Sequence, residues 1–113
     1  MQLTLANRKR LELAKSLAME PQLLMLDEVN AGLNSAEVEQ ALELIRAIAA
    51  RGVTIVIIEH LLKVVMTLCQ RVVVLHHGEL IADGAPRDVV EDERVVSAYL
   101  GARYAERYRR RHA

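Results

Sequence analysis

The side chains with the most chemistry to offer follow two apolar runs. Asp27 and Glu28 come directly after Leu23–Leu26, and Glu59 and His60 come directly after Val53–Ile58. Mg²⁺ prefers oxygen ligands and usually keeps several waters, so Asp27 is a candidate metal ligand. Glu28 points elsewhere and could polarise an attacking water as a general base. His60 could contact a phosphate group or that same water from the neighbouring strand.

A purely structural explanation competes with this chemistry. Strands often end in polar residues, so Asp27 and Glu28 could simply end a strand, and His60 could cap the next helix. For Asp-Glu after an apolar run, taken alone, this explanation is the commoner one. The functional interpretation therefore depends on whether the chain brings these side chains together.

The sequence between the two runs predicts the element that brings them together. Residues 35–51 repeat apolar side chains at helical spacing, namely Val38, Ala41, Leu42, Ile45, Ile48 and Ala49. Asn34 and Glu37 have the types and spacing of a capping box, and Gly52 is placed to end the helix. A strand–helix–strand unit has parallel strands, whose carboxyl ends share the sheet edge where ligands bind. The residues expected at this edge are Asp27, Glu28, Glu59 and His60.

The remaining elements follow from similar patterns. Both apolar runs are continuous, which predicts strands covered on both faces. Residues 7–19 predict a helix whose apolar face holds Leu11, Ala14, Leu17 and Ala18. The elements expected downstream are a helix at 61–69, a hairpin of strands at 72–75 and 79–82, and one or two short helices within 87–100. The expected fold class is α/β, a parallel strand core with a C-terminal β-hairpin and helices.

Composition narrows the class of protein. The formal net charge of the 113 residues is zero, which argues against a nucleic-acid partner. No apolar run approaches the ~20 residues of a membrane span, and no signal peptide is evident, so we expect a soluble, cytoplasmic protein. Cys69 is the single cysteine, which excludes an intrachain disulfide. His76 and His77 suit a solvated hairpin tip better than a metal site, and 102–113 is expected to be a basic tail.

In order and spacing, the motifs from Leu3 to Gly101 resemble those of ABC transporter ATPases. Residues 23–28 resemble the Walker B strand, residues 31–34 the D-loop, residues 57–60 the switch strand with its H-loop histidine, and residues 71–84 the following hairpin. Three further segments resemble the subunits that serve branched-chain amino acid uptake. These segments are 30–34, 59–66 and 96–101.

This resemblance implies that residues 1–101 are the C-terminal portion of an ABC ATPase domain with a partial P-loop NTPase fold. Asp27 would bind Mg²⁺, Glu28 would be the catalytic base, and His60 would sense the γ-phosphate of ATP. The residues implied in nucleotide contact are Thr4 and Ala6 of the signature-like loop and Asn34 of the D-loop. The implied partners are permease subunits and a second ATPase subunit, with a homodimer possible, at the inner face of the membrane.

The chain departs from the family pattern in three places. Residues 3–7 align with the signature Leu-Ser-Gly-Gly-Gln, but Leu5 and Ala6 replace its two glycines. Val29 replaces the proline that usually follows the catalytic glutamate. The sequence contains no phosphate loop of the form Gly-x-x-x-x-Gly-Lys-Ser/Thr. We therefore expect the isolated chain to bind ATP weakly or not at all, and to be inactive or nearly so.

Three functions remain open at this point. The first is an ATP-hydrolysing importer subunit that needs a separate phosphate-loop half. The second is a non-catalytic interaction module that docks on a partner ATPase or permease. A generic α/β ligand-binding domain also fits the strand pattern, but it does not explain why the motifs follow the family order.

Overall fold

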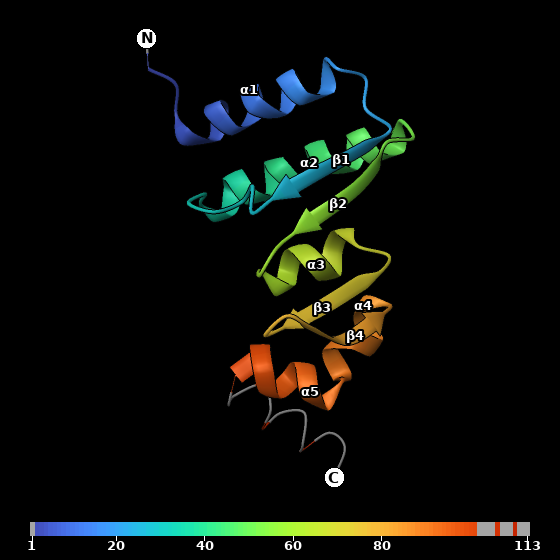
Figure 1. Cartoon of the computed structure of the whole chain (residues 1–113). Coiled ribbons are helices and arrows are strands. Elements are labelled where there is room, and N and C mark those ends of the chain that lie inside the picture. The colour runs from blue at the N-terminus through green and yellow to red at the C-terminus, as the bar shows by residue number, and fades with distance from the viewer. Residues whose placement is uncertain (1, 102–105, 107–109, 111–113) are drawn as a thin grey trace. The chain divides into compact units, whose positions relative to one another are not determined.

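A computed structural model of the chain describes residues 2–101, 106 and 110. The chain divides into two compact units, one ending at Leu61 and the other beginning at Leu62. Their elements are labelled in Figure 1, and each unit is described by itself. The basic tail predicted at 102–113 lies outside the described residues except for 106 and 110.

The first unit contains the predicted strand–helix–strand core. Its elements are α1 (Leu5–Leu17), β1 (Leu23–Asp27), α2 (Ser35–Ala50) and β2 (Thr54–Ile58). The strands β1 and β2 pair in parallel, with Leu23 opposite Thr54 and Asp27 opposite Ile58. The predicted parallel pairing is confirmed, and the ends of α2 and the strands differ from the expected bounds by at most a residue or two.

Local signals set both ends of α2. The Asn34 side chain accepts a hydrogen bond from the Glu37 N–H at 2.9 Å, and the Glu37 carboxylate accepts one from the Asn34 N–H at 3.1 Å. This is the predicted capping box, which satisfies two helix-terminal donors at once. After Arg51, Gly52 takes φ +94°, a left-handed conformation that ends helices at low cost for glycine.

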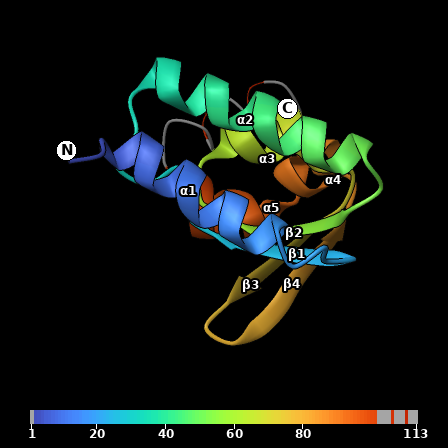
Figure 2. The ribbon, with the colours of Figure 1, turned by 90° about the horizontal axis from the view of Figure 1, so that it is seen from above.

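The two-stranded sheet is covered on one face. Figures 1 and 2 both place α2 along it. The buried apolar side chains of this unit are Leu24, Leu26, Leu42, Ile45 and Ile48. On the opposite face, four apolar side chains remain between 42% and 66% exposed, namely Leu23, Met25, Val56 and Ile58. The prediction of coverage on both faces is therefore wrong for the described chain, because α2 covers only one side.

The prediction for the apolar face of α1 is also wrong. Leu11 and Ala14 are exposed, and α1 buries no residue completely. Leu13 and Leu17 are the better covered side chains, and both line a groove with Leu44 of α2. Helical periodicity identified the helix, but its apolar residues spread over more than one side. Contacts with α2, which lies far along the sequence, decide which side is covered.

The second unit is a hairpin packed with short helices. Its elements are α3 (Leu62–Leu68), β3 (Val72–His76), β4 (Glu79–Gly84), α4 (Pro86–Glu91), α5 (Glu93–Val95) and the π-helical turn η1 (Val96–Leu100). Ala82, Val89 and Val95 form its small core. His77 has φ +50° and Gly78 has φ +77°. Positive φ at both central residues is what a favoured type of two-residue hairpin turn requires. The predicted hairpin is confirmed.

An ion pair joins the outer ends of the hairpin and gives it a pH dependence. Arg71 donates two hydrogen bonds to the Asp83 carboxylate, at 2.8 and 2.7 Å. The hydrogen bond from Arg71 holds the pKa of Asp83 below its usual range. The Asp83 carboxylate therefore binds a proton less tightly in the folded chain than in the unfolded chain. The ion pair stabilises the folded chain fully above the unfolded pKa of Asp83, about 3.9, and this stabilisation is lost as pH falls through the lower folded pKa.

We therefore expect the Asp83→Asn variant to lose less stability on acidification than the unaltered chain. The measurement is urea denaturation of both proteins at a series of pH values from neutral down through the range where carboxylates titrate. Glu79→Gln, an exposed carboxylate on the same strand, is the matched control. If the free energy of unfolding fell equally with pH in Asp83→Asn and in the unaltered chain, the expectation would be wrong.

Candidate functional site

The carboxyl ends of β1 and β2 lie side by side, and the chain turns sharply after β1. Asp27 ends β1 and pairs with Ile58, which ends β2. Glu28 follows with φ +49°, a left-handed conformation that is unusual for a residue other than glycine. Its N–H donates to the Ile58 carbonyl at 2.8 Å. This hydrogen bond ties the turn to the neighbouring strand.

Glu28 and His60 meet across this edge. His60 Nδ1 lies 3.3 Å from Glu28 Oε1, and the two side chains are 62% and 52% exposed. The predicted gathering of these residues is thus confirmed, whereas their catalytic roles remain predictions. A carboxylate that is open to water can accept a proton from a water molecule.

Beneath this exposed pair lies a buried polar pair that sequence reasoning missed. The Glu59 side chain is 2% exposed, and Asn30 is equally buried. Asn30 Nδ2 donates to Glu59 Oε2 at 3.0 Å, and the His60 N–H donates to Glu59 Oε1 at 3.2 Å. In the sequence, Asn30 stood out only as part of a family segment, because burial of a loop asparagine has no periodic signal.

Asp27 suits magnesium only in part. The residue is exposed at the sheet edge, and no group of three or more acidic, histidine or cysteine side chains in the described residues could hold a metal ion. Mg²⁺ is commonly bound through one or two carboxylates, with waters and substrate phosphates completing its shell. The donor set at Asp27 fits an ion that arrives with a phosphate ligand and does not fit an all-protein site.

The signature-like loop is engaged within its own unit. The Thr4 hydroxyl accepts a hydrogen bond from the Asn7 N–H at 3.1 Å and so caps α1. Leu5 packs against the loop after β1, since a Cβ added to Gly32 would lie 2.8 Å from Leu5 Cδ2. Of the predicted nucleotide contacts, Thr4 and Asn34 therefore serve as helix caps in this structure. These roles explain the residue types without any nucleotide.

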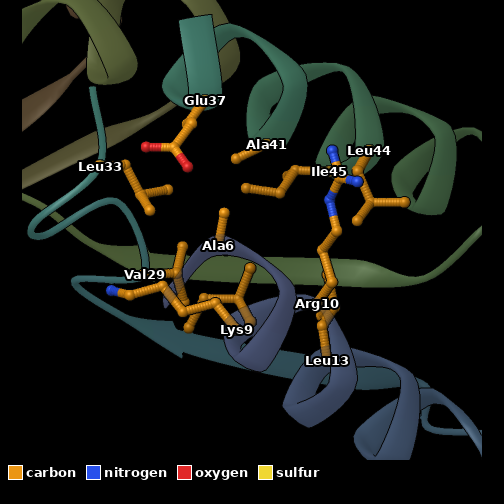
Figure 3. A pocket seen from close by; sticks show the side chains of 11 residues that line it. Ala6, Lys9, Arg10, Leu13, Val29, Leu33, Glu37, Ala41, Leu44 and Ile45 are labelled. Carbon is orange, nitrogen blue, oxygen red and sulfur yellow. The ribbon is translucent and has the colours of Figure 1, made fainter. Parts of the chain in front are cut away.

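Ala6, the third predicted contact, lines a small cavity between α1, α2 and the loop after β1. Figure 3 shows the side chains around this space, most of them apolar. Its volume is about 40 Å³, enough for very little beyond a water molecule or two. Lys9 and Glu37 supply polar groups to its lining. A cavity of this size cannot hold a nucleotide, so we read it as imperfect packing of α1.

Comparison with known proteins shows the family to which the chain belongs. The family described as "Branched-chain amino acid ATP-binding cassette transporter" matches residues 79–105. The transport ATP-binding protein BraF of Pseudomonas aeruginosa is 38% identical over 100 residues, covering 88% of this chain and 39% of BraF. The chain belongs to the ABC transporter ATP-binding family. The lipopolysaccharide export ATP-binding protein LptB of Acidithiobacillus ferridurans is 36% identical over 97 residues, covering 86% of this chain and 40% of LptB.

Solved structures agree with the family assignment. The ADP conformation of an ATP-binding cassette of an ABC transporter matches with a TM-score of 0.80 and 28% identity, over 89% of this chain and 41% of the cassette. The ABC protein cbiO1 of Clostridium perfringens matches with a TM-score of 0.73 and 33% identity, over 84% and 38%. The predicted fold class, part of the ABC ATPase fold, is confirmed.

The chain matches only part of each relative, which limits the properties that the family assignment establishes for it. The chain spans about two fifths of the length of the curated relatives and solved cassettes described above. The described residues include no helix long and apolar enough to cross a membrane. The activity, substrates and partners of the full-length relatives are therefore matters of proposal for this chain.

Proposed function

We propose that this chain supplies the Walker B, D-loop and H-loop part of an ATP-hydrolysing subunit of an ABC importer. The observation that carries the proposal is the Glu28–His60 pair beside Asp27, at the carboxyl edge of a parallel sheet, in a member of this family. The three residues lie at the carboxyl ends of two parallel strands, the edge where α/β sheets bind ligands. Their types are those that hydrolysis of a phosphoanhydride needs.

The geometry is compatible with the role proposed for each residue. Glu28 would accept a proton from the water that attacks the γ-phosphate, as the exposed position of its carboxylate permits. His60, 3.3 Å away, would orient Glu28 and contact the phosphate that is released. Asp27 would hold Mg²⁺, which when bound neutralises charge on the phosphates. The products are ADP and inorganic phosphate.

In this proposal a polypeptide segment outside the 113 residues binds the phosphates of ATP, since the sequence contains no phosphate loop. The exposed sheet face of Leu23, Met25, Val56 and Ile58 supports this part of the proposal. Parallel pairing sets Asp27 opposite Ile58, so the candidate metal ligand borders that face. A segment that buries these apolar side chains would lie beside Asp27. We assign this face to the phosphate-loop segment.

The transported solutes are proposed to be branched-chain amino acids. The match of residues 79–105 to that family supports this choice, as does the similarity to BraF. Similarity to LptB keeps lipopolysaccharide export as a second candidate with the same ATP chemistry. In either case the chain would work with permease subunits and a second ATPase subunit, at the inner face of the membrane.

The competing function is a non-catalytic module that docks on a partner ATPase or permease. The contact of Leu5 with the loop at Gly32 favours it, because a signature loop engaged in this way is less able to reach a nucleotide on another subunit. The two functions differ in one measurable respect, which is ATP hydrolysis by an assembly of this chain with a phosphate-loop segment from a relative such as BraF. Hydrolysis that requires this chain supports the first function.

The isolated chain is expected to show no rise in melting temperature with excess magnesium-ATP. A ligand at 100 times its Kd stabilises the native state by about 2.7 kcal/mol, so real binding would be visible. The measurement compares thermal unfolding with and without the nucleotide, and magnesium alone is the control. A clear rise with the isolated chain, lost in Asp27→Asn, would show that the chain binds ATP without a phosphate loop.

A further inference from the structure

Asn30 and Glu59 join the two segments that carry the candidate catalytic residues. Asn30 lies two residues after Glu28, and Glu59 lies directly before His60. The hydrogen bond from Asn30 Nδ2 to Glu59 Oε2, 3.0 Å long, therefore links the loop after β1 to the end of β2. The other Glu59 oxygen accepts the His60 N–H at 3.2 Å. One buried carboxylate thus holds both segments.

The exposed Glu28–His60 pair needs this support. Both side chains are more than half exposed, and exposed ion pairs contribute little because water screens them. The buried pair below is different, since a carboxylate that is 2% exposed is costly unless hydrogen bonds satisfy it. Its donors are therefore held firmly, and they belong to the segments that present Glu28 and His60.

Asn30 also carries a cost that an apolar residue would avoid. Its Oδ1 is buried, with no hydrogen-bond partner in the described part of the chain. An unsatisfied buried acceptor lowers stability. An apolar residue at this position would spare that cost but would leave Glu59 Oε2 without its donor. An amide side chain at residue 30 is therefore explained by the hydrogen bond that it donates to the Glu59 carboxylate.

We propose that Asn30 is a positioning residue, which acts through Glu59 to hold Glu28 and His60 in contact. The link of this contact to ATP hydrolysis rests on the proposed function, whereas the positioning itself does not. Asn30 touches no reacting atom in this proposal. It sets the loop after β1 against the end of β2, and the Glu28–His60 distance follows from that.

The test is the tautomer of neutral His60, read by long-range ¹H–¹⁵N NMR of the isolated chain without nucleotide at alkaline pH. His60 Nδ1 lies 3.3 Å from Glu28 Oε1 and 3.8 Å from Glu59 Oε1, so the proton is expected on Nδ1, whereas a free imidazole favours Nε2. Asn30→Asp keeps the shape but loses the amide donor and sets a second carboxylate against Glu59. We expect His60 to revert toward the Nε2–H form.

Two further variants make the result specific. Asn34→Asp is the matched control, because a carboxylate there still accepts the Glu37 N–H, and His60 should be unchanged. The double variant Asn30→Asp with Glu59→Gln exchanges donor and acceptor across the buried hydrogen bond. It should restore the Nδ1–H form, and a coupled pair should show this rescue.

The proposal is overturned if unaltered His60 is in the Nε2–H form, or if folded Asn30→Asp keeps the Nδ1–H form. It is also overturned if the double variant folds without restoring that form. Should Asn30→Asp alone fail to fold, the unaltered chain and the double variant decide the matter. Because no nucleotide is present, a failure of the proposed ATPase function would leave this result intact, and the two failures are distinguishable.

Discussion

Replacing Glu28 by glutamine is expected to lower ATP hydrolysis by the assembled cassette by about 100-fold or more, the usual contribution of a general base. Glutamine has nearly the same size but accepts no proton from the attacking water. ATP binding should persist, since Asp27 and the phosphate-loop segment are unaltered. The measurement is phosphate release at saturating ATP, together with ATP affinity, for an assembly of this chain with the phosphate-loop segment of a relative.

The matched control is Glu43→Gln, which makes the same substitution at an exposed site on α2. It should hydrolyse ATP at the unaltered rate. If Glu28→Gln also hydrolysed at that rate, Glu28 would not be the base, and the chain would be better described as a non-catalytic module. Loss of ATP binding together with hydrolysis would instead indicate a structural role for Glu28.

The features that could be predicted from the sequence are those set by local chemistry. The capping box of Asn34 and Glu37, the helix after it and the hairpin turn depend on residues within a few positions of one another. The parallel pairing of β1 and β2 followed from a general rule about crossover connections. That pairing brings Glu28 near His60, so the core of the candidate site was also predictable.

The features that could not be predicted depend on contacts between distant segments. A loop asparagine such as Asn30 is usually exposed, and only the tertiary structure sets it against Glu59, 29 residues along the chain. Thr4 illustrates a different difficulty, because its hydroxyl suits both a helix cap and a phosphate contact. The resemblance to the family signature favoured the phosphate. The structure shows the cap, and the phosphate contact stays a prediction.

Coverage of the sheet is a further feature that the sequence pattern alone did not predict correctly. Leu23–Leu26 is apolar at every position, which is typical of strands buried on both faces. The described chain buries only alternate residues of it. The exposed half of the pattern is the face that we proposed for the phosphate-loop segment, and two neighbouring leucines allow that proposal to be tested.

Leu24→Ala is expected to reduce the free energy of unfolding of the isolated chain by about 2–5 kcal/mol, because it leaves a cavity in a packed interior. Leu24 is 6% exposed, whereas its neighbour Leu23 is 52% exposed on the opposite face. Leu23→Ala should therefore change the stability of the isolated chain by only about 0.5 kcal/mol or less. Urea denaturation of both variants measures the difference.

Leu23→Ala should have a larger effect once the phosphate-loop segment is bound. If that segment covers the exposed face, Leu23 becomes an interface residue, and Leu23→Ala should weaken association of the segment with the chain. Thr54→Ala, on the same face opposite Leu23, removes much less apolar surface and is the matched control. Unchanged association in Leu23→Ala would mean that the segment binds elsewhere. The four exposed apolar side chains of this face would then need a different partner, and the assignment of the face beside Asp27 to the phosphate-loop segment would be wrong.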